Sequence, residues 1–126
     1  MGVEEWTTGV KLTLWDGEAF FGPGVCELLE GIREKGSIQA AAAGMKMSYT
    51  KAWRILNRVE SAMGTQLVTR VSGGKHGGSS RLTEAGERAV RAYRDMELAL
   101  SRTADALLNA HREMFEAKGE RDDLPR

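Results

Sequence analysis

The sequence predicts a mainly helical α+β domain with two short β-hairpins and one long C-terminal helix. Two observations lead to this fold class. Residues 37–82 place a short helix, a break at Gly44, a longer basic helix, a strand, a glycine-rich loop and a second strand in immediate succession. Residues 84–118 contain no Pro, and no Gly beyond Gly86, so a single long helix is expected there.

Length and composition limit the kinds of protein that this chain can be. Its 126 residues suit one domain with one added element, and 41% of them are hydrophobic. No segment approaches the roughly 20 apolar residues of a membrane span. Residues 1–6 carry two glutamates and lack the apolar core of a signal peptide, so we expect a cytoplasmic protein. Cys26 is the single cysteine and follows the apolar pattern of its helix, which favours a buried thiol over a reactive or intermolecular one.

Charge is distributed unevenly along a chain whose net charge is zero. Residues 46–91 hold 9 basic and 3 acidic residues, a balance of +6, whereas residues 1–45 hold 3 basic and 7 acidic ones. Residues 92–126 hold 6 basic and 8 acidic residues. A basic middle between acidic flanks is the electrostatic pattern of a protein that binds nucleic acid, although a merely solvated basic face remains the alternative.

The N-terminal part predicts a hairpin followed by a helix. Residues 10–15 alternate apolar and polar side chains, as a strand does, and Asp16-Gly17 favours a tight turn before a short return strand at residues 19–21. Pro23 suits the first turn of a helix that ends at Gly36. The apolar stripe of this helix consists of Val25, Leu28, Leu29 and Ile32.

Two helix starts close together predict a helix-turn-helix. Ser37 caps a short alanine-rich helix that breaks at Gly44, and small alanines allow the next helix to approach closely. Ser48 caps a helix that extends to about Met63, with Gly64 as its C-cap. The core face of this helix is predicted from its spacing to comprise Ala52, Leu56, Val59 and Met63.

A second hairpin follows the basic helix. Residues 66–71 form the expected strand, residues 72–80 form a glycine-rich tip, and Arg81 begins the return strand. Such a hairpin beside a helix-turn-helix makes a winged helix-turn-helix, whose glycines let the tip approach a DNA duplex. An unattached surface hairpin is the alternative.

The long helix is capped by Thr83 and carries an apolar stripe near heptad spacing. We expect this stripe to pair with a second copy of the chain, while packing onto residues 23–35 of its own chain is the alternative. The proposed dimerisation residues are Tyr93, Met96, Leu100 and Leu107. The expected organisation is therefore a DNA-binding domain over residues 1–82, a dimerisation helix over residues 83–118 and a disordered charged tail over residues 119–126.

The exposed face of the basic helix is expected to enter the major groove of double-stranded DNA. Arg54 is the best candidate for direct readout, because arginine pairs bidentately with guanine. Arg58, one turn further along, is expected at a phosphate, and Trp53 either packs against the wing or meets the DNA backbone. For Ser37 and Ser48, capping and phosphate contact are compatible roles. The complete set of candidate DNA-binding residues is Ser37, Gln39, Ser48, Tyr49, Thr50, Lys51, Arg54, Arg58, Lys75, His76 and Arg81.

Several of these segments resemble the N-terminal DNA-binding domain of the molybdate-responsive (ModE-like) transcription regulators and, more distantly, that of LysR-type regulators. The most specific matches are Ser48-Tyr49-Thr50-Lys51-Ala52-Trp53 and the wing sequence Gly73-Gly74-Lys75-His76-Gly77-Gly78. Further matches are Gly36-Ser37-Ile38, Leu67-Val68-Thr69-Arg70 and Arg81-Leu82-Thr83-Glu84-Ala85-Gly86. The resemblance covers roughly residues 10–115 and implies the fold, dimerisation and DNA binding. Full members of that family carry oxyanion-binding domains after the long helix, which this sequence does not include, so molybdate binding is not implied.

Other functional classes have less support in the sequence. The two histidines, His76 and His111, lie on different elements, and no HExxH, GxSxG or phosphate-loop motif occurs. We therefore expect no enzyme activity, no cofactor and no metal site. A winged helix that serves only as a protein-interaction module is the main alternative, and a small oxyanion sensor with its site at a dimer interface is a minor one.

Overall fold

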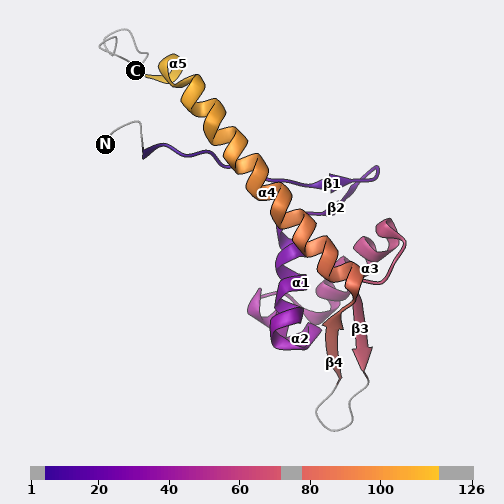
Figure 1. Cartoon of the computed structure of the whole chain (residues 1–126). Coiled ribbons are helices and arrows are strands. Elements are labelled where there is room, and N and C mark those ends of the chain that lie inside the picture. The colour runs from indigo at the N-terminus through magenta and orange to yellow at the C-terminus, as the bar shows by residue number, and fades with distance from the viewer. Residues whose placement is uncertain (1–4, 72–77, 117–126) are drawn as a thin grey trace. The chain divides into compact units, whose positions relative to one another are not determined.

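The computed structural model describes residues 5–71 and 78–116 and confirms the predicted mainly helical α+β fold (Figure 1). The chain divides into two compact units, one spanning Lys11–Met96 and the other comprising Met1–Val10 and Glu97–Arg126. Each unit is described by itself below. The elements, in chain order, are β1 (Leu14–Trp15), β2 (Ala19–Phe21), α1 (Pro23–Lys35), α2 (Ile38–Gly44), α3 (Tyr49–Met63), β3 (Val68–Val71), β4 (Ser79–Leu82), α4 (Glu84–Ala110) and α5 (Arg112–Phe115).

The core of the unit spanning Lys11–Met96 is built around α1. Cys26 is completely buried, as its place on the apolar face predicted. Val25 is only half-buried, and Met63 is 39% exposed, so the predicted core face of α3 ends one turn early. Met63 is the last residue of its helix and lies beyond the core. The buried side chains of the three central helices are Cys26, Leu28, Leu29, Ile32, Ile38, Ala41, Ala42, Ala52, Leu56 and Val59.

The first hairpin is shorter than its sequence alternation predicted. Only Leu14 and Trp15 form β1, and the pairing with β2 shifts register between these two residues. The carbonyl of Leu12 accepts a hydrogen bond of 2.7 Å from the Tyr93 hydroxyl rather than one from a neighbouring strand. Leu12 is therefore bonded to α4, although the alternating side chains around it are typical of a strand.

The second hairpin is regular and is joined firmly to α3. Its strands pair antiparallel from Val68 opposite Leu82 to Val71 opposite Ser79. The Glu60 carboxylate accepts hydrogen bonds from the Leu67 and Val68 amides at 2.7 and 3.2 Å. The sequence predicted that this strand begins at residue 66, but β3 begins at Val68. The two hydrogen bonds to Glu60 fix the base of the hairpin against the end of α3.

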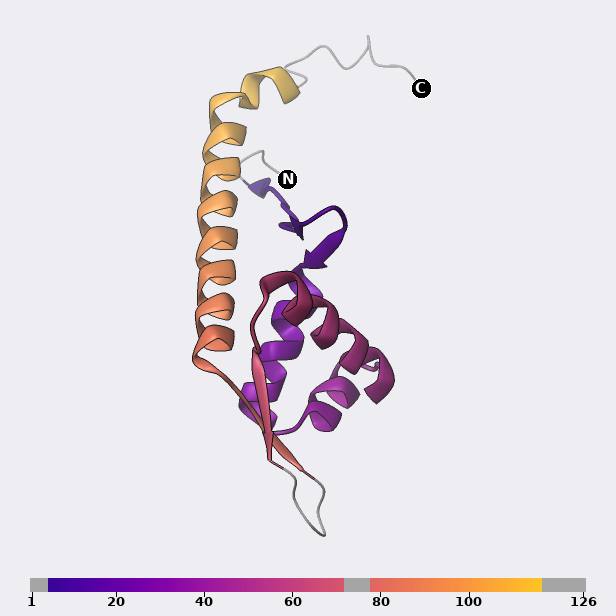
Figure 2. The same cartoon turned by 90° about the vertical axis from the view of Figure 1, so that its right-hand side faces the viewer.

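The start of α4 packs into the same unit. The Thr83 hydroxyl caps the helix by accepting from the Gly86 amide at 3.0 Å, and it donates to the Gln66 carbonyl. Gly86 is buried, and a side chain at this position would overlap the Leu67 carbonyl oxygen. Figure 2 shows this junction, where the chain passes from β4 into α4. Two ion pairs, Arg94–Glu30 and Arg33–Glu87, join α4 to α1.

The prediction that Tyr93 lies on an exposed dimerisation face is wrong. Its side chain is 2% exposed and belongs to the core of its own chain. The Tyr93 ring lies 5.2 Å from that of Phe21, between centroids, and the hydroxyl binds Leu12. Heptad spacing correctly placed Tyr93 on the apolar face of the helix. It did not reveal that Phe21 of the first hairpin already covers this side chain.

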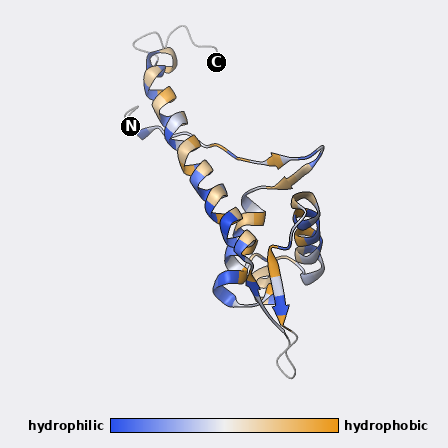
Figure 3. Cartoon of the chain, turned by 45° about the vertical axis from the view of Figure 1, so that its right-hand side comes forward, coloured by the Kyte–Doolittle hydropathy of each residue, from blue (hydrophilic) through white to orange (hydrophobic). Residues whose placement is uncertain are grey.

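The second half of α4 leaves its large apolar side chains exposed, including Leu98, Leu100 and Leu107 at 38–55%. Figure 3 shows apolar residues recurring among polar ones along this helix. The helix ends at Ala110, whereas the sequence predicted an end at residue 118. At the break, Nδ1 of His111 and its backbone amide both approach the Leu107 carbonyl, which draws the last turn tight before α5.

Within the unit formed by the N-terminal segment and the chain from Glu97 onward, one side chain anchors the first described residues. The amide and hydroxyl of Thr8 both donate to Asp105 on α4, at 3.0 and 2.7 Å. These two bonds, the hydroxyl one foremost, lower the pKa of Asp105. Of the helices in residues 5–71 and 78–116, none is long and apolar enough to cross a membrane.

Candidate nucleic-acid interface

The helix-turn-helix consists of α2, the turn at residues 45–47 and α3. Ser37 caps α2 by accepting from the Ala40 amide at 2.8 Å, and Ser48 caps α3 by accepting from the Lys51 amide at 3.0 Å. Both capping predictions are confirmed. Lys46 in the turn adopts the left-handed conformation, with φ of 58°, and hydrogen bonds from residues 45–47 back to α2 hold it there. The turn therefore fixes where α3 begins.

Close packing of small residues makes this arrangement possible. Ala41 and Ala42 are buried between the helices, as the alanine-rich sequence predicted. A Cβ on Gly31 of α1 would lie only 3.1 Å from the Ala41 Cβ. Larger side chains at these positions would push α2 away from α1 and shift the turn that leads into α3.

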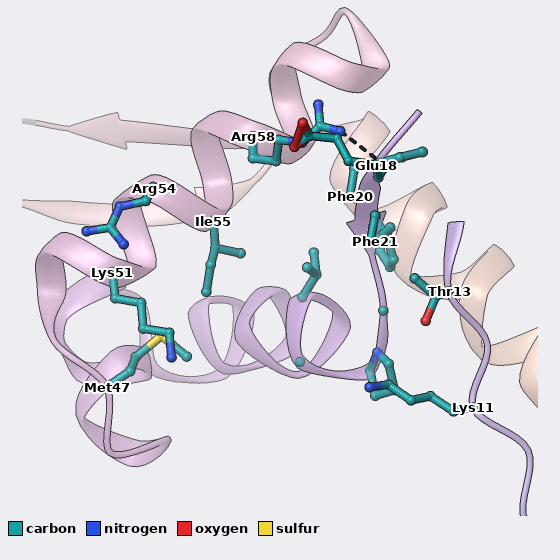
Figure 4. A pocket seen from close by; sticks show the side chains of 15 residues that line it. Lys11, Thr13, Glu18, Phe20, Phe21, Met47, Lys51, Arg54, Ile55 and Arg58 are labelled. Carbon is teal, nitrogen blue, oxygen red and sulfur yellow. Dashed lines mark hydrogen bonds and ion pairs between the residues drawn. The ribbon is translucent and has the colours of Figure 1, made fainter. Parts of the chain in front are cut away.

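The first turns of α3 present polar and basic side chains to solvent. Tyr49, Thr50, Lys51 and Arg54 are all exposed. Figure 4 shows Lys51 and Arg54 on α3 at the edge of a surface groove. Among the described residues neither of these two cations has an ion-pair partner. Their charges are therefore available to an anionic ligand.

Arg58 differs from these two cations, although it lies on the same helix. Its guanidinium binds both carboxylate oxygens of Asp16 and the carbonyl of Glu18, and its Nε lies 3.4 Å from a carboxylate oxygen of Glu18. The hydrogen bond from Arg58 lowers the pKa of Asp16, and the same bond raises the pKa of Arg58. A phosphate contact, the role expected from sequence, would have to displace the acidic tip of the first hairpin. No local sequence pattern around Arg58 indicates this partner.

Trp53 packs against the core, in line with the first of the two roles expected from sequence, and it holds a cation that sequence reasoning did not single out. The guanidinium carbon of Arg70 on β3 lies 3.3 Å from the centroid of a Trp53 ring. Tyr49 meets the same tryptophan edge-on, with 6.1 Å between ring centroids. Stacking on an indole orients the guanidinium plane while leaving its charge unneutralised. Arg70 therefore joins α3 to the second hairpin as part of the same surface.

The remaining candidates are distributed over α2 and the second hairpin. Gln39 is exposed on α2, whereas Ser37 is half-buried and serves as a cap. Arg81 is exposed on β4 opposite Thr69 of β3. The tip residues Lys75 and His76 lie outside the described residues.

A short helix, a fixed turn, an exposed basic helix and a hairpin anchored to its end define a winged helix-turn-helix domain. Residues 26–87 match the model of the bacterial regulatory helix-turn-helix proteins of the lysR family. Over these residues the chain is similar to that family.

The chain is also similar to longer proteins, some of which are named for molybdenum. It is 39% identical over 80 residues to the molybdenum transport protein ModE of Azotobacter vinelandii, covering 64% of this chain and 30% of the relative. It is 31% identical over 106 residues to the DNA-binding transcriptional dual regulator ModE of Escherichia coli K12, covering 84% of this chain and 36% of the relative. The molybdenum-pterin-binding protein MopB of Rhodobacter capsulatus is 37% identical over 75 residues, which are 60% of this chain and 28% of that protein. The chain thus spans about a third of the length of these relatives.

Proposed function

We propose that this chain is a sequence-specific, dimeric, DNA-binding transcription regulator without catalytic activity. In this proposal α3 lies in the major groove and the second hairpin meets the backbone or the minor groove. The observation that carries the proposal is the pair of exposed cations, Lys51 and Arg54, on the first turns of a helix positioned by a helix-turn-helix. Arg54 is proposed to contact a base, and Lys51 and Arg70 are proposed to contact phosphates.

The dimer is proposed to form through the stripe comprising Met96, Leu100 and Leu107 on α4. These side chains are 38–55% exposed, and apolar side chains at near-heptad spacing gain free energy when a second helix covers them. A symmetric dimer would place two copies of α3 on one side of the DNA, about one helical turn or a multiple of it apart.

Molybdate is not proposed as a ligand of this chain. The names of two of these relatives associate them with molybdenum, but the chain matches only about a third of the length of each relative. The matched part contains the helix-turn-helix, which accounts for DNA as the partner.

The test of DNA binding is a fluorescence-anisotropy titration with a duplex from the upstream region of the protein's own gene and a scrambled duplex, at about 100 mM salt. We expect tighter binding to the upstream duplex, and weaker binding with reduced sequence preference for Arg54→Ala. Arg102→Ala is the matched control, because Arg102 is an exposed arginine on the second half of α4. Absence of binding to either duplex at low salt would reject the proposal and favour the protein-interaction module.

The dimer is tested separately by sedimentation equilibrium. The double variant Leu100→Glu, Leu107→Glu should be monomeric at concentrations where the wild-type chain is dimeric, because it places charges in the proposed seam. Asn109→Glu is the control, since Asn109 is exposed on the same helix about half a turn from the stripe. Equal masses for the double variant and the wild-type chain would exclude this surface as the dimer contact.

A further inference from the structure

A groove of about 730 Å³ lies between the first hairpin, the start of α1 and α3 (Figure 4). Its floor is apolar and is formed by Phe20, Val25, Met47 and Ile55, each of which is half-buried against the core. Grooves of this volume and character accommodate small organic molecules, whose apolar parts replace water against such a floor.

The rim of the groove carries an excess of positive charge. Lys11, Lys51 and Arg54 are exposed at the rim, and in the described part of the chain they have no ion-pair partner. The other two charged lining residues, Arg58 and Glu18, pair with one another. The rim therefore keeps three uncompensated cations beside an apolar surface.

The start of α1 adds to this positive field. Gly22, the N-cap residue, provides no side-chain hydrogen bond, and the first turn contains no acidic residue. Both Gly22 and Gly24 line the groove, and a Cβ on Gly24 would meet nothing within 4 Å. The positive end of the helix dipole thus reaches the groove, and no carboxylate in the first turn of α1 neutralises it.

We propose that this groove binds a small amphipathic carboxylate, with an aromatic or medium-length aliphatic body on the apolar floor and the carboxylate at the cationic rim. A neutral apolar molecule would leave the three cations without a partner, and a small inorganic anion would leave the floor in water. An anion with an apolar body satisfies both parts of the site.

A consequence for regulation follows, and it rests on the proposed DNA-binding function. Lys51 and Arg54 belong both to the rim and to the proposed DNA interface, so a bound carboxylate competes with DNA for the same charges. DNA must weaken carboxylate binding by the same factor, because the two equilibria are thermodynamically linked.

The direct test uses 1-naphthoate as the probe and neutral 1-naphthalenemethanol as its matched control, without DNA. In calorimetric titrations we expect saturable binding of naphthoate, at least about tenfold tighter than that of the alcohol because only the carboxylate pairs with the rim. Backbone amide resonances of Val25 and Ile55 should shift on titration. No saturation, equal affinity for both probes, or shifts confined to the exposed stripe of α4 would overturn the proposal.

A charge reversal on the rim locates the site without touching the proposed DNA contacts. Lys11→Glu should weaken naphthoate binding about tenfold, since an attraction becomes a repulsion. Lys35→Glu is the control, because Lys35 is an exposed lysine at the far end of α1 and does not line this groove. Equal losses in both variants would mean that naphthoate responds only to overall charge, which contradicts the proposed site.

The coupling is tested last, by repeating the DNA titration in saturating naphthoate. DNA affinity should fall, and it should fall less in Lys11→Glu. Undiminished DNA affinity would overturn the coupling. A chain that fails to bind DNA would disprove the proposed function, whereas the calorimetric result on the carboxylate site would stand by itself.

Discussion

The first and second halves of α3 both carry arginine, but the two arginines are in different electrostatic environments. Arg54 is exposed and has no ion-pair partner among the described residues, whereas Arg58, one turn later, is bound by Asp16 and Glu18 of the first hairpin. The sequence of α3 gives no sign of this difference. A basic helix therefore does not by itself define which cations reach DNA, because a distant segment can neutralise some of them.

The largest expected effect separates these two arginines directly. Arg54→Ala should cost about 1–3 kcal/mol of DNA-binding free energy and relax the preference for one base pair, because a bidentate base contact is lost. Arg58→Ala should change the DNA-binding free energy much less. Anisotropy titrations of both protein variants with the upstream duplex and with duplexes changed at single base pairs measure the binding free energy and the base preference. Equal losses would show that Arg58 leaves its carboxylates to bind DNA.

The next effect concerns Arg70, which is oriented by the Trp53 ring. Arg70→Gln should weaken binding to all duplexes alike and reduce the slope of log K against log salt by about 1, as expected when one phosphate contact is lost. Trp53→Phe, which keeps a smaller ring under Arg70, should give an intermediate loss. A change in base preference for Arg70→Gln would instead indicate that this residue reads sequence.

A smaller effect, of opposite sign, is expected from releasing Arg58. The double variant Asp16→Asn, Glu18→Gln should raise DNA affinity by a few fold, because it frees Arg58 and removes two negative charges near α3. The free energy of unfolding should change little, since such exposed pairs contribute little to stability. Unchanged DNA affinity together with normal stability would place the hairpin tip far from bound DNA.

The smallest expected effect is on the free energy of unfolding, and it comes from Arg94, which pairs with Glu30 away from α3. The hydrogen bond from Arg94 lowers the pKa of Glu30 below its ordinary 4.5. The stabilisation from this pair is therefore present above about pH 4.5 and is lost as pH falls through the lowered folded-state pKa. Arg94→Met should reduce the free energy of unfolding by at most about 1 kcal/mol at pH 7, with a difference that disappears at low pH.

Urea unfolding of this variant and of the wild-type chain at a series of pH values measures that difference. DNA binding by Arg94→Met should equal that of the wild-type chain, which makes Arg94 the reference for an arginine whose pairing is purely structural. A constant difference in unfolding free energy across the pH series would show that Arg94 acts through packing alone.

Local rules predicted much of the fold. The caps at Ser37, Ser48 and Thr83 are all present, because a hydroxyl before a helix satisfies a backbone amide whatever the tertiary context. Predictions that depend on a partner from elsewhere in the chain were less accurate. The strand before Trp15 is shorter than expected, and there the Leu12 carbonyl accepts a hydrogen bond from the distant Tyr93 hydroxyl.

The candidate site shows the same division. Exposure of Lys51 and Arg54 follows from helical periodicity, because Arg54 lies opposite the buried face of Ala52, Leu56 and Val59 and Lys51 lies beside it. The stacking of Arg70 on Trp53 joins residues 17 positions apart, and no repeat spacing encodes that contact. Tyr93 shares the helical stripe of Leu100 and Leu107, yet it is buried against Phe21 of the first hairpin.

By itself, the sequence determined the helix-turn-helix, the basic face of α3 and the apolar stripe of α4, because all three depend on spacing within a single helix or turn. Tertiary structure alone decided that Arg58 is neutralised, that Arg70 is oriented on Trp53, and that a cationic rim surrounds an apolar groove. Each of these features joins residues on separate elements. Their meeting depends on how hairpins and helices pack, which is a property of the whole core and not of any local pattern.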